Sequence, residues 1–549
     1  MWLDQADGFD EIFKGYLPYY LLVMFPILII MSPVNPVAAS HEFSVYRMQQ
    51  YDLHTVPHGC RSSSFNLEGR SLTLWSTSRH CVVARIQDIT IEQFIDIRNK
   101  AGALLLVLPK NDTLLTDDER EHIYLLEAVM AQQEVNLPVY FAEWSSDFEY
   151  IIKDLQHSFI TDEKSGTALE AMFNTVSSNG YQIVVSTPAI QKLDSKPTVL
   201  HGKLTGRAAS AQTIVVAAHY DASSVVPELS FGADSNASGV VALLELARVF
   251  SRLYGSAAVR GGPSILFLLV STGHSLNYFT TKKWLEEHLD TADSSILQDV
   301  SFVMCLDSIS SGPLKMHVSK PPKPGTVSHS MKSRLSVPFV HKKINLADEL
   351  LAWHHERFSI RRMTAFTLSS LESHKEPRRS SLLDSYTEPS LESLVDNIKT
   401  TARALASHIY NITEETSEED SAMFDEALNV DEASVRSWYK YLTSQTRAPQ
   451  FLTTATQNGG VTGALERAMT RYMEVTSSVH VVDKREPEYT LYGPTKAVLY
   501  VYSVKPAVFD LILTLAIVAY LALVYFAIQI FPRFYTEYAK LVTGKEKVY

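Results

Sequence analysis

Apolar runs of five to eight residues alternate with amphipathic stretches in two parts of the chain, a pattern that predicts parallel strands joined by helices. In the first part, helices are predicted at residues 91–99 and 117–133, and buried strands at residues 102–109 and 137–141. In the second part, buried strands are predicted at residues 213–218, 264–271 and 301–306, and a helix at residues 239–253. Both parts are therefore expected to be α/β units with mostly parallel mixed sheets and flanking helices.

Polar and acidic segments mark the boundaries between these units. A linker is predicted at residues 161–166, and the acidic run at residues 414–420 marks a second boundary. Two helical stretches follow, and then a predicted hairpin at residues 489–503 that Gly493 and Pro494 interrupt. This organisation predicts a smaller N-terminal α/β unit at 41–160, a larger α/β domain at 165–410, and membrane-proximal helices and a hairpin at 411–507.

The N-terminus contains an uncharged run of 15 residues, 17–31, which is too short to span about 30 Å of hydrocarbon comfortably. Small residues follow the run, so residues 1–40 are predicted to be a signal peptide that is cleaved after Ala39 or Ser40. The segment before the run is acidic, whereas signal peptides begin with basic residues. An uncleaved membrane anchor is therefore the alternative.

A second apolar run, residues 508–531, is long enough to cross a bilayer as a helix. Arg533, Lys540, Lys545 and Lys547 follow it, so the positive-inside rule places residues 532–549 in the cytosol. Together with a signal peptide, this predicts a single-pass type I membrane protein whose bulk lies in an oxidising lumen. Lys545 and Lys547 form a pattern typical of dilysine retrieval signals, which predicts residence in the endoplasmic reticulum membrane.

Charge and cysteine content narrow the function classes. The 61 acidic residues exceed the 49 Lys and Arg residues, and this excess argues against direct nucleic-acid binding, which needs clustered cations. Three cysteines in 549 residues exclude a disulfide-stapled scaffold and a zinc ribbon of the CxxC type. Cys60 and Cys81 could pair in the lumen, which the sequence leaves open, and Cys305 is predicted to be a small core residue.

Polar side chains gather where the predicted strands of the larger domain end. His219 and Asp221 follow the strand at 213–218, and Asp307 follows the strand at 301–306. Because the carboxyl ends of parallel strands meet at one edge of a sheet, a site is expected there. The sequence contains no G-x-S-x-G elbow, P-loop or H-E-x-x-H motif. The basic stretch at residues 354–362 is interpreted as a solvated or partner-facing helix side rather than a ligand cluster.

These segments resemble a known family. His219-Tyr220-Asp221, the turn and helix start at residues 232–239, a buried strand and Cys305-Leu306-Asp307 occur in the order found in the zinc aminopeptidase and transferrin-receptor superfamily, which includes nicastrin. The resemblance covers roughly residues 165–410, and the unit before it resembles the protease-associated insert of several relatives. Three further segments extend the resemblance: His41-Glu42-Phe43 after the predicted signal peptide, residues 504–510 at the entry into the membrane, and the lysine tail. Over its whole length the chain is similar to the nicalin family.

The resemblance also implies that catalytic residues are missing. In the active enzymes an aspartate bridges two zinc ions, and its position falls on Ser235 here. The general base and a metal-binding carboxylate fall on Gly273 and His274. The segment that supplies the last histidine ligand corresponds to residues 378–384, which contain no histidine.

His219, Asp221 and Asp307 do remain at the family's positions. His219 and Asp307 would provide one ligand for each metal, whereas a zinc site needs three or four, and Asp221 would only orient the histidine. We therefore expect no catalytic residues, no bound metal and no other cofactor.

The favoured function is a non-catalytic scaffold in the endoplasmic reticulum membrane. The resemblance implies that its partners are nodal modulator (NOMO) and transmembrane protein 147, in a complex that joins the ribosome-bound translocon during insertion and assembly of multipass membrane proteins. The alternatives are a degenerate zinc peptidase and a nicastrin-like substrate receptor. Metal analysis separates an enzyme from a scaffold, and affinity isolation separates the two binding roles.

Three N-x-[ST] triplets, at Asn111, Asn236 and Asn411, are candidate glycosylation sites in the lumen. Asn236 directly follows Ser235, at the place where an active relative would bridge its metals. Loop-to-helix junctions at the end of a parallel sheet are exposed, so Asn236 is predicted to be reachable, and a glycan there would obstruct the cleft. The alternative is that helix formation hides the side chain.

Overall fold

The computed structural model describes residues 41–543, except 74–78, 112–113, 133, 164–179, 193–195, 208–211, 291–295, 298, 413–427, 453–459 and 505–506. The signal peptide predicted at residues 1–40 lies outside the described residues, as do Lys545 and Lys547 of the predicted retrieval signal.

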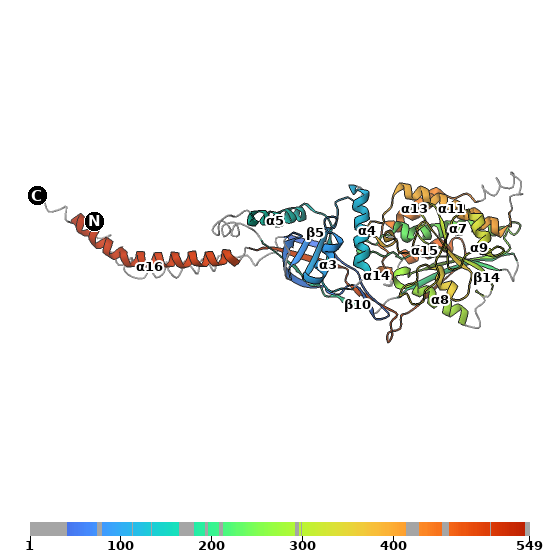
Figure 1. The fold of residues 1–549 in the computed structure, drawn as a ribbon, viewed down its shortest axis with the longest axis horizontal. Coiled ribbons are helices and arrows are strands. Elements are labelled where there is room, and N and C mark those ends of the chain that lie inside the picture. Colours follow the sequence, from blue (N-terminus) through green and yellow to red (C-terminus); the bar gives the residue numbers. More distant parts are fainter. Residues whose placement is uncertain are drawn as a thin grey trace.

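The N-terminal unit is a closed barrel, which lies between the long C-terminal helix α16 (Ala507–Thr543) and the larger domain (Figure 1). Its strands, in order around the barrel, are β1 (His41–Arg47), β20 (Lys496–Val504), β9 (Gly180–Val185), β4 (Phe65–Ser71), β5 (Cys81–Arg85), β6 (Ala103–Val107) and β8 (Val139–Ala142). β5, β6 and β8 run parallel, which confirms the parallel pair predicted from the two apolar runs.

Helices cover both sides of these parallel strands. α3 (Ile91–Lys100) and α4 (Asp117–Gln132) pack on one side, and α5 (Ser146–Glu163) packs on the other. α3 begins at a capping box in which Thr90 and Gln93 satisfy each other's backbone N–H groups. Because both sides are covered, every residue of β6 is buried, which explains its uninterrupted apolar sequence.

A second, smaller sheet joins the barrel to the larger domain. Its strands are ordered β10 (Ile190–Lys192), β19 (Tyr489–Gly493), β2 (Gln50–Leu53), β3 (Val56–Cys60) and β7 (Glu134–Val135). β19 therefore pairs with β2 and β10, whereas β20 pairs with β1 and β9. The predicted hairpin at residues 489–503 is wrong, because its two halves enter different sheets.

The predicted limits of the first unit also change. Buried and exposed residues alternate along β20, as expected for a strand with one covered face. The same alternation occurs in a barrel wall and in a hairpin, so it does not distinguish between them. β9 and β20 complete the barrel, so the unit predicted at 41–160 also includes one strand that follows the predicted linker and one strand that directly precedes α16.

The larger domain is built on a mixed sheet ordered β16 (Phe339–His341), β15 (Lys315–Val318), β17 (Ala365–Ser369), β14 (Val300–Leu306), β12 (Thr213–His219), β13 (Ser264–Val270), β11 (Thr198–Leu204) and β18 (Val475–Val479). The central strands β17, β14, β12 and β13 are parallel, as the apolar runs predicted. The helices around it are α7 (Gly239–Gly255), α8 (Phe279–Asp290), α9 (Val327–Leu335), α10 (His355–Ile360), α11 (Glu388–Ile409), α13 (Glu432–Thr443), α14 (Pro449–Leu452) and α15 (Val461–Thr470).

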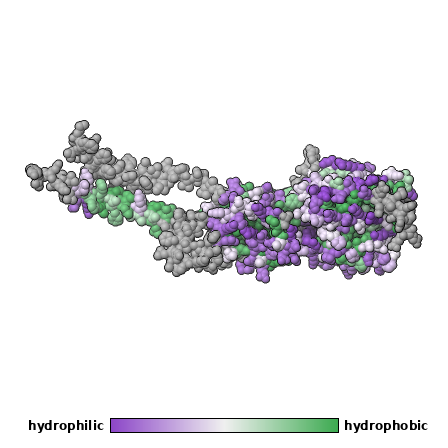
Figure 2. All heavy atoms as spheres, turned by 90° about the horizontal axis from the view of Figure 1, so that it is seen from above, coloured by the Kyte–Doolittle hydropathy of each residue, from purple (hydrophilic) through white to green (hydrophobic). Residues whose placement is uncertain are grey.

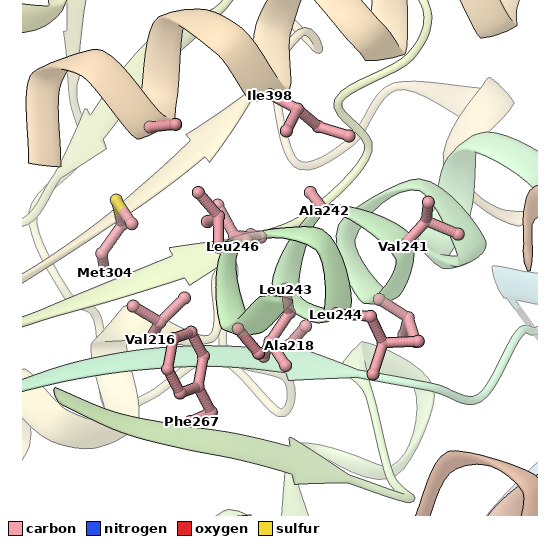
Figure 3. Packing of buried hydrophobic residues seen from close by; sticks show 14 of the residues in the cluster. Val216, Ala218, Val241, Ala242, Leu243, Leu244, Leu246, Phe267, Met304 and Ile398 are labelled. Carbon is pink, nitrogen blue, oxygen red and sulfur yellow. The ribbon is translucent and has the colours of Figure 1, made fainter. Parts of the chain in front are cut away.

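Helix α7 is the centre of the largest core. It lies between the sheet and α11, so Leu243, Leu246 and Ala242 contact apolar side chains on two sides (Figure 3). Val216 of β12 and Met304 of β14 face it from the sheet. A helix enclosed in this way must be apolar around most of its circumference, which is the pattern of residues 239–253.

The helices after residue 430 belong to this core and not to a membrane-proximal segment. Val435 and Tyr439 of α13 and Leu465 of α15 are buried against α7 and its neighbours. Figure 1 shows α13 and α15 on the larger domain, with the barrel between them and α16. The membrane-proximal position predicted for these helices is therefore wrong, because their apolar faces are covered by the larger domain.

Within the described residues, α16 is the one helix long and apolar enough to cross a membrane, with a candidate span at Leu513–Tyr538. The apolar side chains of this span are exposed, and Figure 2 shows them as a hydrophobic rod beside largely hydrophilic globular units. The predicted span at 508–531 overlaps this helix. Aromatic side chains gather near its end, among them Phe534, Tyr535 and Tyr538, as is typical of membrane interfaces.

Closure of the barrel by β20 can be tested on two adjacent residues. Leu499 is fully buried in the barrel core, whereas Val498 on the opposite side of the strand is 42% exposed. Leu499→Ala should lower the free energy of unfolding of the detergent-purified chain by about 2–5 kcal/mol because it leaves a cavity, and Val498→Ala by less than about 1 kcal/mol. Equal shifts in thermal unfolding would contradict the assignment of β20 to the barrel.

Candidate functional site

The parallel strands of the larger domain bring the predicted polar residues together at their carboxyl ends. His219 ends β12, Asp221 follows it, and Asp307 follows β14. His219 Nδ1 lies 3.0 Å from Asp221 Oδ1, and His219 Nε2 lies 3.7 Å from Asp307 Oδ2. All three side chains are at most 2% exposed. The structure thus brings the three residues together at one edge of the sheet.

The two carboxylates hold a positive charge on the histidine. Burial alone would lower the pKa of His219, but the carboxylates of Asp221 and Asp307 overcome this effect and raise that pKa to about 9. His219 is therefore an imidazolium at neutral pH. A protonated imidazole has no free lone pair, so it cannot bind a metal ion without losing its proton first.

A buried arginine occupies the other side of Asp307. The guanidinium of Arg379 donates to Asp307 Oδ2 at 2.5 Å and to the hydroxyl of Tyr278 at 2.8 Å, and it stacks 4.6 Å from the ring centroid of Trp353. Burial would raise the pKa of Asp307, but Arg379 and His219 hold it well below its usual range. Two cations, His219 and Arg379, thus face two carboxylates, Asp221 and Asp307, and the site's charge is balanced by protein alone.

Arg379 lies in the segment that replaces the family's last histidine ligand. This segment contains the short helical turn Pro377–Ser380 and continues to Asp384. The absence of histidine from this segment was predicted from the sequence, but the role of Arg379 was not.

Gly273, at the position that the family resemblance assigns to a general base, is packed closely against His219 and Asp221. Its backbone N–H donates to Asp221 Oδ2 at 2.8 Å, and a Cβ atom at this position would lie 2.6 Å from His219 Nδ1 and 2.9 Å from Asp221 Oδ1. Any side chain here would collide with the His219–Asp221 pair. The backbone therefore takes the space that a carboxylate would need.

His274 and Ser235 also point to other partners. His274 Nε2 lies 2.7 Å from the hydroxyl of Ser380, and burial together with the charge of Arg379 keeps the pKa of His274 well below its usual value. Ser235 is held by its backbone N–H, which donates to Asp384 Oδ2 at 2.9 Å. The neighbouring carboxylate of Asp234 accepts hydrogen bonds from the backbone and hydroxyl of Ser310, both at 2.8 Å.

The residues present do not fit a zinc pair. Ser235 and Gly273 stand at the positions that the family resemblance assigns to the bridging carboxylate and the general base, and the segment expected to carry the last ligand contributes the cation Arg379. Within the described part of the chain, no group of three or more His, Cys, Asp or Glu side chains is arranged to hold a metal ion. A metal ion placed beside the positive charges of His219 and Arg379 would be repelled by them.

Two buried ionisable side chains, which were not predicted from the sequence, hold the loops of this site. Glu127 of α4 accepts hydrogen bonds from the Ser381 hydroxyl and from the backbone N–H of Leu382 at 3.0 Å. Arg447 donates to the backbone carbonyls of Tyr220, at 3.1 Å, and Gly232. Glu127 thereby connects the barrel unit to the segment that carries Arg379. No local sequence pattern marks either residue, because a charged residue on a helix or loop usually faces solvent.

Asn236 is not exposed, contrary to the prediction. Its side chain is fully buried: Nδ2 donates to the carbonyls of His219 and Leu306 at 3.1 and 2.9 Å, and Oδ1 accepts from the backbone of Gly239 and Ser308. The folded domain leaves no room for a glycan at this position. Asn111 and Asn411, in contrast, are exposed.

The cysteines and the 354–362 stretch also differ from expectation. Cys60 and Cys81 are both free and buried, in cores on different sides of the barrel strands, so the possible disulfide is not formed. Cys305 is a fully buried core residue, as predicted. His354 and His355 are buried rather than solvated, and burial lowers the pKa of each to about 3.

A cavity of about 450 Å³ opens beside the site. It is lined from the larger domain by residues that include Ser223, His274 and Ser380, and from the small sheet by residues that include Tyr51 and His58. The cavity therefore lies at the junction of the small sheet and the larger domain.

Comparisons with known proteins identify the family and the fold of the chain. A family model described as Peptidase family M28 matches residues 200–273. BOS complex subunit NCLN of Mus musculus is 41% identical over 545 residues, and Nicalin of Caenorhabditis elegans is 31% identical over 552 residues; the alignments cover 96% and 94% of this chain and 96% of each relative.

Among solved structures, the gamma-secretase component nicastrin superposes with a TM-score of 0.56 at 11% identity, over 84% of this chain and 99% of that chain. At this identity the similarity concerns the fold alone. The aminopeptidase-like fold expected from the sequence is therefore confirmed.

Gly273 gives a direct test of the close packing in the site. Gly273→Ala should lower the free energy of unfolding by roughly 1–3 kcal/mol, because the new Cβ would overlap His219. Gly262→Ala is the matched control, since a Cβ there meets no atom within 4 Å. Its effect should stay below about 1 kcal/mol in either direction. Thermal unfolding that tolerates Gly273→Ala as well as the control would refute the packing argument.

The charge on His219 predicts a pH dependence. The folded-state pKa of about 9 exceeds the unfolded value of about 6.5, so the protonated histidine stabilises the fold fully below pH 6.5, and this contribution is lost as the pH rises through 9. The loss amounts to about 3 kcal/mol.

The measurement is the unfolding free energy of the purified chain between pH 6 and 9.5, compared with His219→Gln. Burial raises the pKa of Glu127 to about 8 and that of Asp384 to about 7, and both add a slope of the same sign. The difference between wild type and variant isolates His219. Identical slopes in the two proteins would show that His219 is neutral in the folded chain.

Proposed function

The chain belongs to the family of BOS complex subunit NCLN, called nicalin in Caenorhabditis elegans, and on that premise we propose that it is a non-catalytic subunit of a membrane-protein complex. The proposal places it in the endoplasmic reticulum membrane as a single-pass type I protein with its bulk in the lumen. Its partners would be nodal modulator (NOMO) and transmembrane protein 147, next to the ribosome-bound translocon, where it would assist insertion and assembly of multipass proteins.

The observation that carries the non-catalytic part is the ion pair between Arg379 and Asp307 beside the protonated His219. A two-metal peptidase uses metal charge to generate its nucleophile and to stabilise the transition state. Here arginine and histidine charges take the place of that metal charge, and neither can activate water in the same way. Loss of a general base at Gly273 alone typically costs 10²–10⁴ in rate.

Two further features support a scaffold. The barrel and the larger domain are joined by buried contacts, such as Glu127 with the 377–384 segment, so they present one extended surface to partners. The exposed apolar rod of α16 provides the membrane attachment. The exposed acceptors Asn111 and Asn411 are consistent with glycosylation in the lumen.

A nicastrin-like substrate receptor is the second candidate. The cavity of about 450 Å³ beside His274 favours it, because a receptor needs a concave site and a scaffold does not. A scaffold should form stable complexes of fixed composition, whereas a receptor should exchange many ligands through this cavity.

Affinity isolation separates these roles. A tagged full-length chain from detergent-solubilised microsomes should bring down NOMO and transmembrane protein 147 in stoichiometric amounts, and a similarly tagged unrelated type I membrane protein should not. His274→Ala, which alters the cavity wall, should leave this set of partners unchanged. Loss of the partners in that variant would favour a receptor, and chelator-sensitive cleavage of aminoacyl reporters by the isolated chain would favour a peptidase.

The proposed retrieval signal has its own test. Replacing both Lys545 and Lys547 with Ser should allow a fraction of the protein to reach the Golgi, where its glycans become resistant to endoglycosidase H. Lys540→Ser is the matched control, because it removes a nearby positive charge of α16 without changing the terminal pattern. If the double variant stays as sensitive as the control, the tail is not the signal that holds the protein in the endoplasmic reticulum.

A further inference from the structure

A large cavity lies at the edge of the larger domain, away from the His219 site. It has a volume of about 740 Å³ and is lined by the ends of β15 and β16, by α9 and α10, and by the start of β17. Because β17 is parallel to β14, its start lies at the opposite end of the sheet from Asp307. The cavity is therefore separate from the site that corresponds to the peptidase cleft.

The lining of this cavity is cationic. Lys320, His341, Lys343 and Arg362 contribute to it together with four hydroxyl side chains, those of Ser319, Ser328, Ser359 and Thr364. Among the described residues that line it, none is an aspartate or a glutamate. Val318, Ile344, Met363 and Ala365 supply an apolar floor.

The sequence around the cavity shows the same segregation of charge. Residues 308–347 contain seven Lys and Arg residues and no Asp or Glu, although the whole chain has a net charge of −12. Such a separation raises the local positive potential, which draws anions toward this edge of the domain.

The cavity's cations are available for a ligand. Within the described residues, no carboxylate lies within salt-bridge distance of Lys320, Lys343 or Arg362. Lys342, the neighbour of Lys343, provides the contrast, since it lies 3.7 Å from Glu356 and 3.9 Å from Asp348. One lysine of this adjacent pair is neutralised within the protein, and the other faces the cavity.

The backbone at Arg362 adds a second, independent observation. Arg362 has a φ of 65°, in the left-handed region that usually favours glycine or asparagine after a helix. An arginine in this conformation is strained, and such strain is commonly retained where a side chain has a function. Here the conformation ends α10 and places a guanidinium on the cavity wall.

We propose that this cavity binds a small organic anion that carries phosphate groups, such as a nucleoside diphosphate. Guanidinium, ammonium and hydroxyl donors together match the several acceptor oxygens of a phosphate. The volume lies in the range of small-molecule sites, and the apolar floor suits a ligand with an organic body. α9 lies at the end of the molecule farthest from α16, so the headgroups of the membrane crossed by α16 are out of reach (Figure 1).

The test measures binding of ADP and of inorganic pyrophosphate to the full-length chain in detergent, by equilibrium dialysis at low and at physiological salt. Both should bind, and ADP should bind more tightly because its organic body contacts the apolar floor. Arg362→Gly removes the guanidinium and relaxes the backbone, so it should fold at least as well as wild type and weaken ADP binding about tenfold. Lys343→Ala should act in the same direction.

Lys323→Ala is the matched control, because Lys323 lies in the same basic segment but does not line the cavity. Its ADP affinity should stay within about twofold of wild type. Absence of ADP and pyrophosphate binding at millimolar concentration would overturn the proposal. Equal losses of ADP affinity in Lys323→Ala and Arg362→Gly would also overturn it, because they would indicate diffuse charge attraction. Tighter binding of an oligo-glutamate peptide than of ADP would overturn it as well, because it would identify an acidic protein segment as the occupant. The outcome does not depend on the scaffold role.

Discussion

The carboxylates of Asp221 and Asp307, both fully enclosed by the larger domain, require compensating positive charge, because an unpaired ion in a protein interior is very costly. In the active relatives a pair of metal ions supplies that charge. In this chain the protonated His219 and the guanidinium of Arg379 supply it, at 3.0 Å from Asp221 and 2.5 Å from Asp307. The charge of the buried carboxylates is thus balanced by side chains of this chain.

The surrounding structure follows from this replacement. Arg379 must stay aligned with Asp307, and the segment that carries it is held by Glu127 from the barrel unit and by Asp384, which accepts the backbone N–H groups of Asp234 and Ser235. Gly273 leaves space for the His219–Asp221 pair that a larger residue would fill. These contacts fix the positions of the charged side chains relative to one another.

Much of this arrangement could be predicted from the sequence. Uninterrupted apolar runs predicted β6, β12, β13 and β14, because a strand that is covered on both faces is apolar at nearly every position. The gathering of His219, Asp221 and Asp307 at one edge of the sheet was also predictable, because all three follow strands that run parallel.

The errors have physical reasons as well. β19 and β20 have the local pattern of a hairpin, and only the pairing of distant strands places them in different sheets. Asn236 was expected to be exposed, but its amide forms hydrogen bonds with four backbone groups. These bonds could not be predicted from the local sequence. Arg379 was not identified because an ion pair across 72 residues depends on the tertiary structure. Long-range pairing of strands and of charges is therefore what the sequence did not predict here.

The replacement of metal by side-chain charge is tested most directly by zinc binding. The full-length chain, purified in detergent without chelator, is dialysed to equilibrium against excess zinc and analysed for its metal content. The account predicts much less than one zinc ion per chain, because His219 and Arg379 already neutralise the carboxylates. Two tightly held zinc ions per chain would contradict it.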